Sequence, residues 1–176
     1  MDQTDVLIIG CGIAGATAAL RLARNPDCKI LVITRDPDPH ESNSRYAQGG
    51  IIGRGLDDTA EYLAKDILAA GAGASSPRMA QILAEEGPAL LQEILVDTAH
   101  IQFDSQSGGE PEYGQEAAHS RRRILHVGDG TGQAIVKGLI QTMRTYPNIT
   151  ILPNMTAVDL ITFPHHSRDP LSTYDP

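Results

Sequence analysis

Hydrophobic positions near the N-terminus change from a short continuous run to a helical spacing and back again. Residues 6–9 are an unbroken aliphatic run that is too short for a helix and is typical of a buried parallel strand. Over residues 13–24 the apolar side chains recur at helical spacing, at Ala16, Leu20 and Ala23. Residues 28–34 form a second aliphatic run. Together the three segments predict a strand, a helix and a parallel strand joined by a right-handed crossover.

Apolar stripes predict two helices in the middle of the chain. The first is expected to begin at a capping-box-like pair, Asp58 and Glu61, and to end at Gly71. The second is expected to open at Pro77, because proline suits the first turn of a helix. We expect the Gly-Pro pair that ends at Pro88 to interrupt this second helix before its apolar stripe resumes. Both stripes are interpreted as core packing.

The rest of the chain continues the alternation of elements. Residues 131–145 carry one apolar face at helical spacing, residues 149–152 form an aliphatic strand, and a further strand is expected near residues 157–162. Residues 36–55 are rich in Pro, Ser, Asn and Gly and predict a long loop, while residues 100–114 predict a surface loop or a short hairpin. The pattern indicates an α/β fold with a parallel sheet.

A Gly-x-Gly-x-x-Gly turn, formed by Gly10, Gly12 and Gly15, joins the first strand to the first helix. The first glycine permits a sharp turn, the second lets a phosphate approach the backbone, and the third lets the helix pack on the strand. Free N–H groups at the helix N-terminus attract negative charge, so the turn predicts a bound dinucleotide. A glycine turn without a ligand stays open as the alternative. A membrane span is excluded because the apolar run is shorter than the ~20 residues that a bilayer needs.

The end of the second strand offers several groups for the sugar of a dinucleotide. A ribose-binding acid is expected about 20 residues after the glycines, and Asp36 lies 21 positions after Gly15. Thr34 and Arg35 stand where the strand itself ends, and a hydroxyl and a cation there could hold the ribose and a phosphate instead. A polar exit from the strand without a ligand is equally compatible with the sequence.

Composition restricts the class of protein. The chain has 176 residues, 41% hydrophobic content and a net charge of −8, which suits one core in an acidic cytoplasmic protein and disfavours nucleic acid or an anionic membrane as partner. The N-terminus has neither the basic region nor the cleavage site of a signal peptide. Cys11 and Cys28 are expected to be buried thiols too far apart for a disulfide, and no metal site is predicted.

Two further motifs resemble those of a known family of flavoproteins. Residues 43–51, Asn-Ser-Arg-Tyr-Ala-Gln-Gly-Gly-Ile, resemble the flavin-binding segment of the succinate dehydrogenase, fumarate reductase and L-aspartate oxidase superfamily. Residues 116–126, followed by Gly-Asp-Gly-Thr-Gly at 128–132, look like the substrate-side segment of the L-aspartate oxidases within it. The resemblance extends from about Asp5 to Ile161, and the combination of motifs is far more specific than any one of them.

The resemblance implies an FAD cofactor that is bound non-covalently. In the dehydrogenase and reductase relatives a histidine at the position of Asn43 is joined to the flavin, and an amide cannot form that bond. The positions that match FAD-binding residues of the family lie in the glycine turn, after the second strand, in the 43–51 segment and beyond residue 152. They are Gly10, Cys11, Gly12, Ile13, Ala14, Gly15, Arg35, Asn43, Ser44, Arg45, Tyr46, Ala47, Gln48, Gly49, Gly50, Thr156 and Ala157.

Glu116 resembles the acidic residue by which aspartate oxidases recognise the α-ammonium group of their substrate. A carboxylate near the flavin accepts a charge-assisted hydrogen bond from that group, which favours aspartate over analogues without an amine. A solvated loop glutamate is the alternative. His119 and the arginines at 121–123 are interpreted as groups that hold the loop or meet anionic parts of substrate and cofactor, because one short basic run in an acidic chain is weak evidence for nucleic acid.

The resemblance also implies an activity and a domain organisation. The expected activity is FAD-dependent oxidation of L-aspartate to iminoaspartate, with oxygen or fumarate as acceptor, in the first step of NAD biosynthesis. Residues 1–162 would form the N-terminal part of a Rossmann-like FAD-binding domain that is incomplete because the chain stops before the capping domain, and residues 163–176 would form a mobile tail. We therefore expect the chain alone to be inactive and to retain FAD weakly or not at all. Contact with the next enzyme of the pathway stays open.

Two other functions stay open at this point. A fumarate reductase-like or succinate dehydrogenase-like flavoprotein would share the glycine turn and residues 47–50, although Asn43 and Glu116 speak against it. A non-catalytic module that binds ADP-like dinucleotides would need the glycine turn alone.

Overall fold

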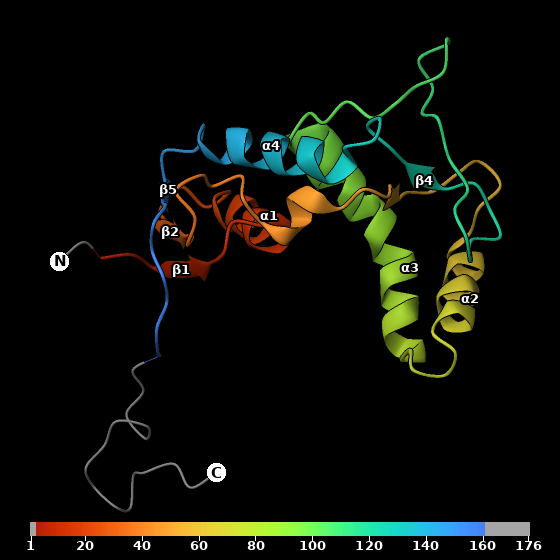
Figure 1. Ribbon diagram of the computed structural model, residues 1–176, viewed down its shortest axis with the longest axis horizontal. Coiled ribbons are helices and arrows are strands. Elements are labelled where there is room, and N and C mark those ends of the chain that lie inside the picture. Colours follow the sequence, from red (N-terminus) through yellow and green to blue (C-terminus); the bar gives the residue numbers. More distant parts are fainter. Residues whose placement is uncertain (1–2, 161–176) are drawn as a thin grey trace, which may run out of the picture.

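A three-stranded parallel sheet forms the centre of the first of two lobes. The computed structural model describes residues 3–160. In the sheet, β1 (Val6–Ile9), β2 (Ile30–Ile33) and β5 (Ile149–Leu152) lie in the order β1-β2-β5, so β2 is the central strand (Figure 1). Short aliphatic runs form these strands: β2 is mostly buried, β5 buries Ile149, and β1 has one partly buried face. The predicted strands at 6–9, 28–34 and 149–152 are confirmed, with small differences at the ends of the second.

Two helices cover one face of this sheet. The first, α1 (Ile13–Leu22), and the last, α4 (Thr131–Met143), pack against each other on the same side of the strands (Figure 1). Alternate residues of a strand point to opposite faces, and Ile30 and Val32 of β2 point into the core below these helices. The buried cluster continues through the apolar stripes of the two helices and includes Ala16, Ala19, Leu20, Ile135, Val136, Leu139, Ile140 and Met143.

The opposite face of the sheet carries exposed aliphatic side chains. Leu7 and Ile9 of β1 are 52% and 65% exposed, and Leu152 of β5 is 39% exposed. Parallel sheets are normally covered on both faces, because their crossover helices lie on either side. Within residues 3–160 helices lie on one face only, and this leaves an apolar surface on the other.

The second lobe is built from two helices and a short ribbon. An antiparallel pair, α2 (Ala60–Ala70) and α3 (Pro77–Leu91), packs together, and α3 continues into the π-helical segment η2 (Gln92–Thr98) that leads back to the first lobe (Figure 1). The ribbon pairs β3 (Ile51–Ile52) with β4 (Ile124–Leu125). Neither strand of this ribbon was predicted, since two residues are too few to show a period.

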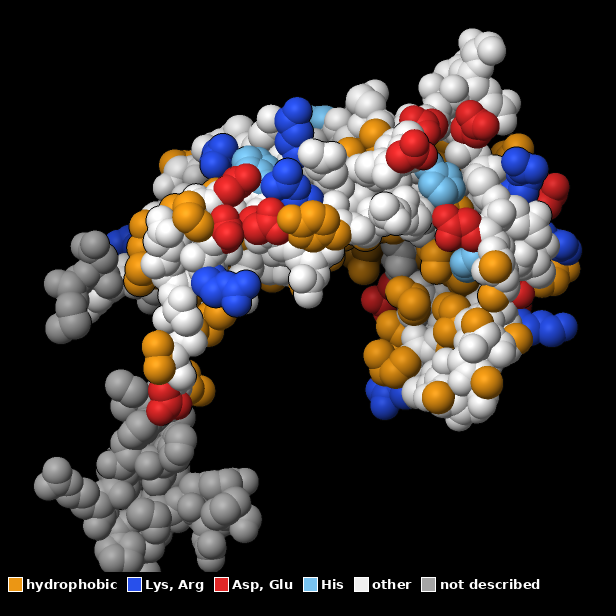
Figure 2. All heavy atoms as spheres, in the orientation of Figure 1, with side chains coloured by type: hydrophobic (Ala, Val, Ile, Leu, Met, Phe, Trp, Pro, Cys, Tyr) orange, Lys and Arg blue, Asp and Glu red, His pale blue; other side chains and the backbone are white. Residues whose placement is uncertain are grey.

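An apolar groove of about 680 Å³ separates the lobes. Side chains from α1, β3 and α3 line it, among them Ile13, Ile52, Leu83 and Leu91. The space-filling view shows the molecule hollowed between its two lobes (Figure 2). The lobes are therefore joined at η2 and at the segments around the ribbon rather than along their whole length.

The two predicted loops contain short ordered elements. Inside the 36–55 loop a 3-10 helix, η1 (Asn43–Tyr46), precedes β3. Within residues 100–114 an antiparallel bridge joins Ser105 to Pro111, so this segment is a short hairpin. Both predictions of irregular segments are confirmed in outline.

The predicted interruption of the second helix at Pro88 is wrong. Helix α3 runs without a break from Pro77 to Leu91, with Pro88 inside it. Proline lacks the N–H that would bind the carbonyl of Ala84, four residues earlier. The Nη2 group of Arg54 donates to that carbonyl at 2.6 Å and replaces the missing hydrogen bond. A side chain from another segment thus allows the helix to pass through its proline.

The predicted start of α2 is also wrong by one residue. Thr59, not Asp58, is the N-cap, and its hydroxyl accepts from the backbone N–H of Tyr62 at 3.4 Å. A hydrogen bond between Thr59 and Glu61 lowers the pKa of that carboxyl. Asp58 is instead buried and bound to Arg123. The predicted end of α2 at Gly71 is confirmed.

Three smaller expectations had other outcomes. Residues 157–160 form no strand, and residues 161–162, with the tail predicted at 163–176, lie outside the described residues. Both cysteines are free thiols; Cys11 is buried as expected, but Cys28 is only partly buried. Cys28 precedes β2 and packs at the edge of the main core cluster.

Candidate functional site

The glycine turn between β1 and α1 requires glycine at two positions. Gly10 has a φ of +105°, a conformation that side chains disfavour, and its N–H donates to the carbonyl of Ile33 at 2.8 Å. At Gly15 a Cβ atom would collide with the carbonyl oxygen of Gly10. The turn is therefore as tight as the sequence predicted, with the helix packed directly on the strand.

The N-terminus of α1 faces the segment that follows β2. Gly12 is the N-cap and provides no side chain to cap the helix. The hydroxyl of Ser44 accepts from the N–H of Ile13 at 3.2 Å, so a residue 31 positions away binds the first turn. The remaining free N–H groups of this turn and the helix dipole favour an anion at this place.

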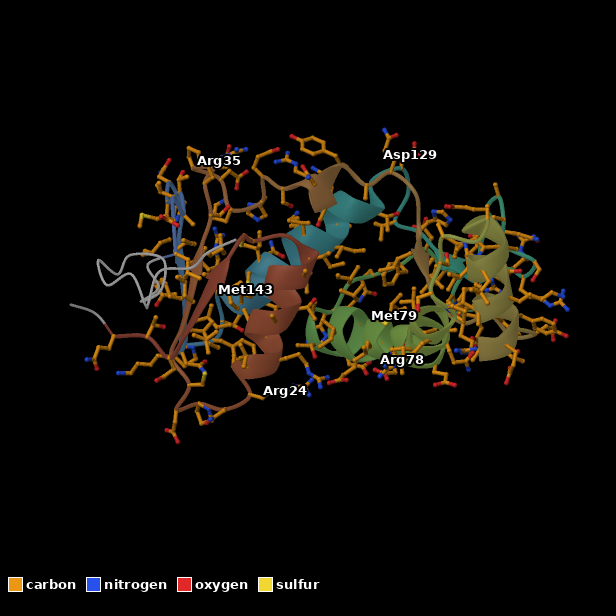
Figure 3. All side chains as sticks on the ribbon, turned by 90° about the horizontal axis from the view of Figure 1, so that it is seen from below. Arg24, Arg35, Arg78, Met79, Asp129 and Met143 are labelled. Carbon is orange, nitrogen blue, oxygen red and sulfur yellow. The ribbon has the colours of Figure 1, made fainter. Side chains whose placement is uncertain are left out.

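A cleft of about 440 Å³ opens beside the glycine turn. It lies beyond the carboxyl ends of the strands, which is where open α/β sheets bind ligands. In a view turned by 90°, Arg35 lies at one end of the first lobe and Arg24, which follows α1, at the other (Figure 3). The cleft is lined by Ile9, Gly10, Cys11, Gly12, Ile33, Thr34, Arg35, Asp36, Glu41, Ser42, Asn43, Met155, Thr156 and Ala157.

The cleft joins residues from all four of the predicted groups of cofactor-binding residues. The glycine turn, Arg35, Asn43 and the pair Thr156 and Ala157 come from distant parts of the sequence and line the same hollow. Arg35 is exposed and makes no ion pair with the described part of the chain. Asp36, the alternative ribose ligand, already accepts from the N–H of Asp38 at 2.9 Å. Arg35 is thus the freer of the two groups.

A buried polar atom in the cleft has no partner among the described residues. The hydroxyl of Ser42 is enclosed and makes no hydrogen bond. Buried hydroxyls are almost always paired, so an unpaired one in a cleft indicates a place for a ligand oxygen. Together with the open helix N-terminus and Arg35, Ser42 makes a donor set that fits the phosphates of a dinucleotide. The sequence did not predict Ser42 as a binding residue, since a single serine in a loop carries no recognisable motif.

The 43–50 segment continues from this cleft along the start of α4. The carbonyl of Ala47 accepts from the N–H of Gly132 at 3.0 Å. Two of its predicted cofactor residues point elsewhere: Arg45 pairs with Glu41 at 3.3 Å, and Tyr46 is 64% exposed. The sequence predicted the segment as a unit, whereas the structure separates residues that line the cleft from residues that face solvent.

Glu116 lies against the far end of the same segment. Its Oε1 accepts from the N–H of Gly50 at 3.1 Å, and Gly49 lies beside the same carboxylate. His126 completes this arrangement, with its Nε2 at 3.6 Å from Oε1 of Glu116. The side chains of Glu116 and His126 are 44% and 29% exposed, so both remain open to a ligand.

His126 is a site residue that sequence reasoning missed. It follows β4, and its ring occupies the space that a side chain at Gly50 would fill. The sequence around His126 does not indicate that this residue contacts Glu116. The two side chains come together because β3 pairs with β4. The glycine pair at 49–50 was the one available signal that something approaches closely there.

The basic run at 121–123 holds its own loop. Arg121 stacks over the ring of Tyr62 at 4.5 Å, and Nε of Arg122 donates to the carbonyl of Tyr113 at 2.9 Å. The side chain of Arg123 is completely buried and forms ion pairs with Asp58 and Asp66. These contacts agree with the interpretation that residues 121–123 hold their loop in place.

Cys11 lines the cleft with an unreactive thiol. Burial raises its pKa to about 11, and the charge of Arg144 offsets only part of this effect. The thiolate is the reactive form of cysteine, so Cys11 serves to pack the turn rather than to act as a nucleophile.

Comparison with known proteins identifies the family of the chain. Residues 5–168 match the family model described as an FAD binding domain. The chain belongs to this family. FAD is therefore the cofactor of the domain, and the expected superfamily of flavoproteins is confirmed.

Curated relatives show the same grouping. The chain is 40% identical over 159 residues to an L-aspartate oxidase of Halobacterium salinarum, which covers 90% of this chain and 30% of that protein. It is 41% identical over 165 residues to an L-aspartate oxidase of Agrobacterium fabrum, covering 92% of this chain and 31% of that protein. The chain thus spans about a third of the length of these relatives.

A solved flavoprotein shares the fold. A quinol-fumarate reductase determined with menaquinol molecules superimposes with a TM-score of 0.79 at 25% identity, over 88% of this chain and 27% of that chain. Among residues 3–160, no helix is long and apolar enough to cross a membrane. The α/β fold with a parallel sheet is confirmed by these similarities and by the strand order.

Proposed function

We propose that this chain provides the FAD-binding part of an enzyme that oxidises L-aspartate to iminoaspartate in the cytoplasm. The electron acceptor would be oxygen or fumarate, and the reaction would open NAD biosynthesis, with its unstable product passed to the next enzyme. The observation that carries the proposal is Glu116, held by the N–H of Gly50 beside the 43–50 segment. Identities of 40% and 41% to L-aspartate oxidases support it.

The residues of the cleft would hold FAD along its length. Gly12 and the first turn of α1 would receive the pyrophosphate, Ser42 would donate to a phosphate oxygen, and Arg35 would lie at the adenosine end. Thr156 and Ala157 would border the adenine. Asn43 lacks the nucleophilic ring nitrogen of a histidine, so we propose non-covalent binding. When bound, FAD supplies the two-electron acceptor that protein side chains lack.

Glu116 would select a substrate that carries an ammonium group. Its second carboxylate oxygen, Oε2, makes no hydrogen bond with the described residues, whereas Oε1 is engaged by Gly50. An ammonium group can therefore donate to Oε2 without displacing the backbone. His126 beside it would add a second polar group at the same end of the substrate. Fumarate and succinate have no ammonium and would gain nothing from Glu116.

Replacing Glu116 tests this role. In a chimera in which this chain replaces the matching residues of the Agrobacterium fabrum relative, Glu116→Gln should weaken aspartate-dependent flavin bleaching. A lost hydrogen bond to a charged group costs about 1.5–3 kcal/mol, which corresponds to roughly 10- to 100-fold in aspartate affinity. Fumarate reduction should change by less than about threefold.

The matched control is Glu112→Gln, which removes an exposed glutamate in the neighbouring hairpin. It should leave both substrates unaffected. If Glu116→Gln weakens aspartate and fumarate equally, Glu116 does not select the ammonium group.

Titration with nucleotides separates the flavoenzyme from a plain dinucleotide-binding module. Any ligand that binds only the native state raises the unfolding temperature of the 176-residue chain, by an amount that grows with the logarithm of the ratio of ligand concentration to Kd. We expect FAD to stabilise the chain more than ADP does at equal concentration, even if binding is weak. Equal stabilisation by ADP and FAD would favour the module. As before, we expect the 176 residues alone not to turn over aspartate.

A further inference from the structure

Arg123 lies at the centre of a buried cluster of charges. Its side chain is completely buried, and Nε and Nη2 donate to the two oxygens of Asp58 at 2.8 and 2.7 Å. Its Nη1 donates to Oδ2 of Asp66 at 2.6 Å. Arg123 precedes β4, while Asp58 and Asp66 lie just before and within α2. The guanidinium therefore ties the chain around residue 123 to α2.

The same cluster holds the loop that precedes Arg123. Oδ2 of Asp66 also accepts from the N–H and the hydroxyl of Ser120, at 2.8 and 2.9 Å. Nη1 of Arg123 lies 3.0 Å from Nδ1 of His119. Because arginine only donates, Nδ1 of His119 is the acceptor in this contact. Two successive loop residues are thus attached to the ion cluster.

Backbone contacts carry this constraint on to Glu116. The N–H of His119 donates to the carbonyl of Glu116 at 3.2 Å, and Nε2 of Gln115 donates to the carbonyl of His119 at 2.8 Å. At the other side of the loop, the N–H of Arg123 donates to the carbonyl of Gly114 at 3.0 Å. The loop is therefore closed at its base by Arg123 and folded onto the cluster at its middle.

We propose that Arg123 is the positioning residue for Glu116. Through Asp58 and Asp66 it fixes residues 114–122 on α2, and the loop then holds the Glu116 carboxylate against Gly50. This inference rests on the proposed function of Glu116 as the group that selects the ammonium of the substrate. Selection by one carboxylate needs it placed to within a fraction of an ångström, and a loop of this length has no such precision without a tether.

The planar guanidinium of arginine, with several donors in a fixed arrangement, suits this positioning role better than the single ammonium group of a lysine. Three donors of one planar group bind two carboxylates, one just before α2 and one within it, so the angle between loop and helix is fixed. A buried ion cluster is weak evidence for stability, since desolvation offsets much of its attraction. Placement of a functional loop accounts for the link from this cluster through His119 to the backbone of Glu116.

Amide exchange measured by NMR on the 176-residue chain tests the positioning. The reporter is the N–H of Gly50, which is bound by Glu116 and touches no member of the ion cluster. Arg123→Lys keeps the charge and loses the fork, so exchange at Gly50 and Ser120 should quicken by about tenfold. Amides of β2 should change by less than about twofold. If Arg123→Lys fails to fold, Asp66→Asn provides a second test. It keeps both hydrogen bonds between Arg123 and Asp58, and exchange at Gly50 and Ser120 should quicken by a smaller factor.

The controls separate positioning from general support. Glu93→Gln breaks an exposed ion pair with Arg21 and should leave Gly50 unchanged. In Glu116→Gln the Gly50 amide already loses its charged partner, so adding Asp66→Asn should quicken its exchange no further. The proposal is overturned if exchange at Ser120 quickens while exchange at Gly50 stays the same, or if all amides quicken by the same factor. It is also overturned if Glu116→Gln and Asp66→Asn have additive effects on the exchange of the Gly50 amide. These results do not depend on aspartate, so a failure of the proposed function shows separately in the flavin-bleaching experiment.

Discussion

At the residue scale, two glycines of the turn are fixed by the backbone around them. Gly10 adopts a positive φ, and Gly15 has the carbonyl of Gly10 where its Cβ would stand. The sequence pattern predicted both roles, because the spacing of this turn depends on local geometry. Glu116 differs, because the residues near it in sequence say nothing of Gly50, its partner 66 positions away.

Gly15→Ala should destabilise the fold although alanine is the better helix former. The new methyl group would push against a carbonyl of the turn, and overpacking of this kind costs about 1–3 kcal/mol. Gly108→Ala is the matched control, because no atom lies within 4 Å of its Cβ position. Urea unfolding should show a lower midpoint for Gly15→Ala and nearly the wild-type midpoint for Gly108→Ala. Equal midpoints would mean that the turn can widen freely.

At the element scale, α3 shows how a distant residue overrides a local rule. Pro88 predicted a break, and the helix continues because Arg54 binds the carbonyl of Ala84. The other helices followed their local signals: α1, α2 and α4 have the apolar stripes that predicted them, and their ends differ from the predicted ones by at most two residues. The ribbon of β3 and β4 could not be predicted, since it exists through pairing alone.

Arg54→Met should destabilise the protein through α3. The carbonyl of Ala84 would lose its donor in a partly buried place, which costs about 1–3 kcal/mol of unfolding free energy. Restoring the backbone N–H with Pro88→Ala should remove most of this cost, so the two substitutions should not add in urea unfolding. Arg78→Met, at an exposed position of the same helix, serves as control. Full additivity of Arg54→Met and Pro88→Ala would contradict the role given to Arg54.

At the scale of the whole molecule, two lobes meet through a few segments, and charges join parts that are distant in sequence. Asp66 illustrates this, because burial would raise the pKa of its carboxyl, but hydrogen bonds from Ser120 and Arg123 lower it below the ordinary value. A carboxyl with a lowered pKa stabilises the fold above its unfolded pKa, near 3.8. That stabilisation is lost as pH falls through the folded pKa.

Acid should therefore weaken the protein, and Asp66 should contribute to the slope. We expect the unfolding free energy to fall between about pH 4 and pH 2, with a shallower fall in Asp66→Asn. Asp57→Asn removes an exposed carboxylate without a hydrogen-bond partner in residues 3–160 and serves as the charge-matched control. Urea unfolding at several pH values measures both. An unchanged slope in Asp66→Asn would show that its bonds are equally strong in the protonated state.

The sequence by itself determined the strand, the glycine turn and the helix at the N-terminus, because each depends on residues within a few positions of one another. Tertiary structure alone decided which side chains meet: Arg54 with Ala84, Arg123 with Asp58, and Glu116 with Gly50 are separated by 30, 65 and 66 positions. Such pairs leave no period in the sequence, since they form only when whole elements pack. The glycine turn is thus local in origin, while the rest of the cleft and the contact between Glu116 and Gly50 depend on the packing of distant segments.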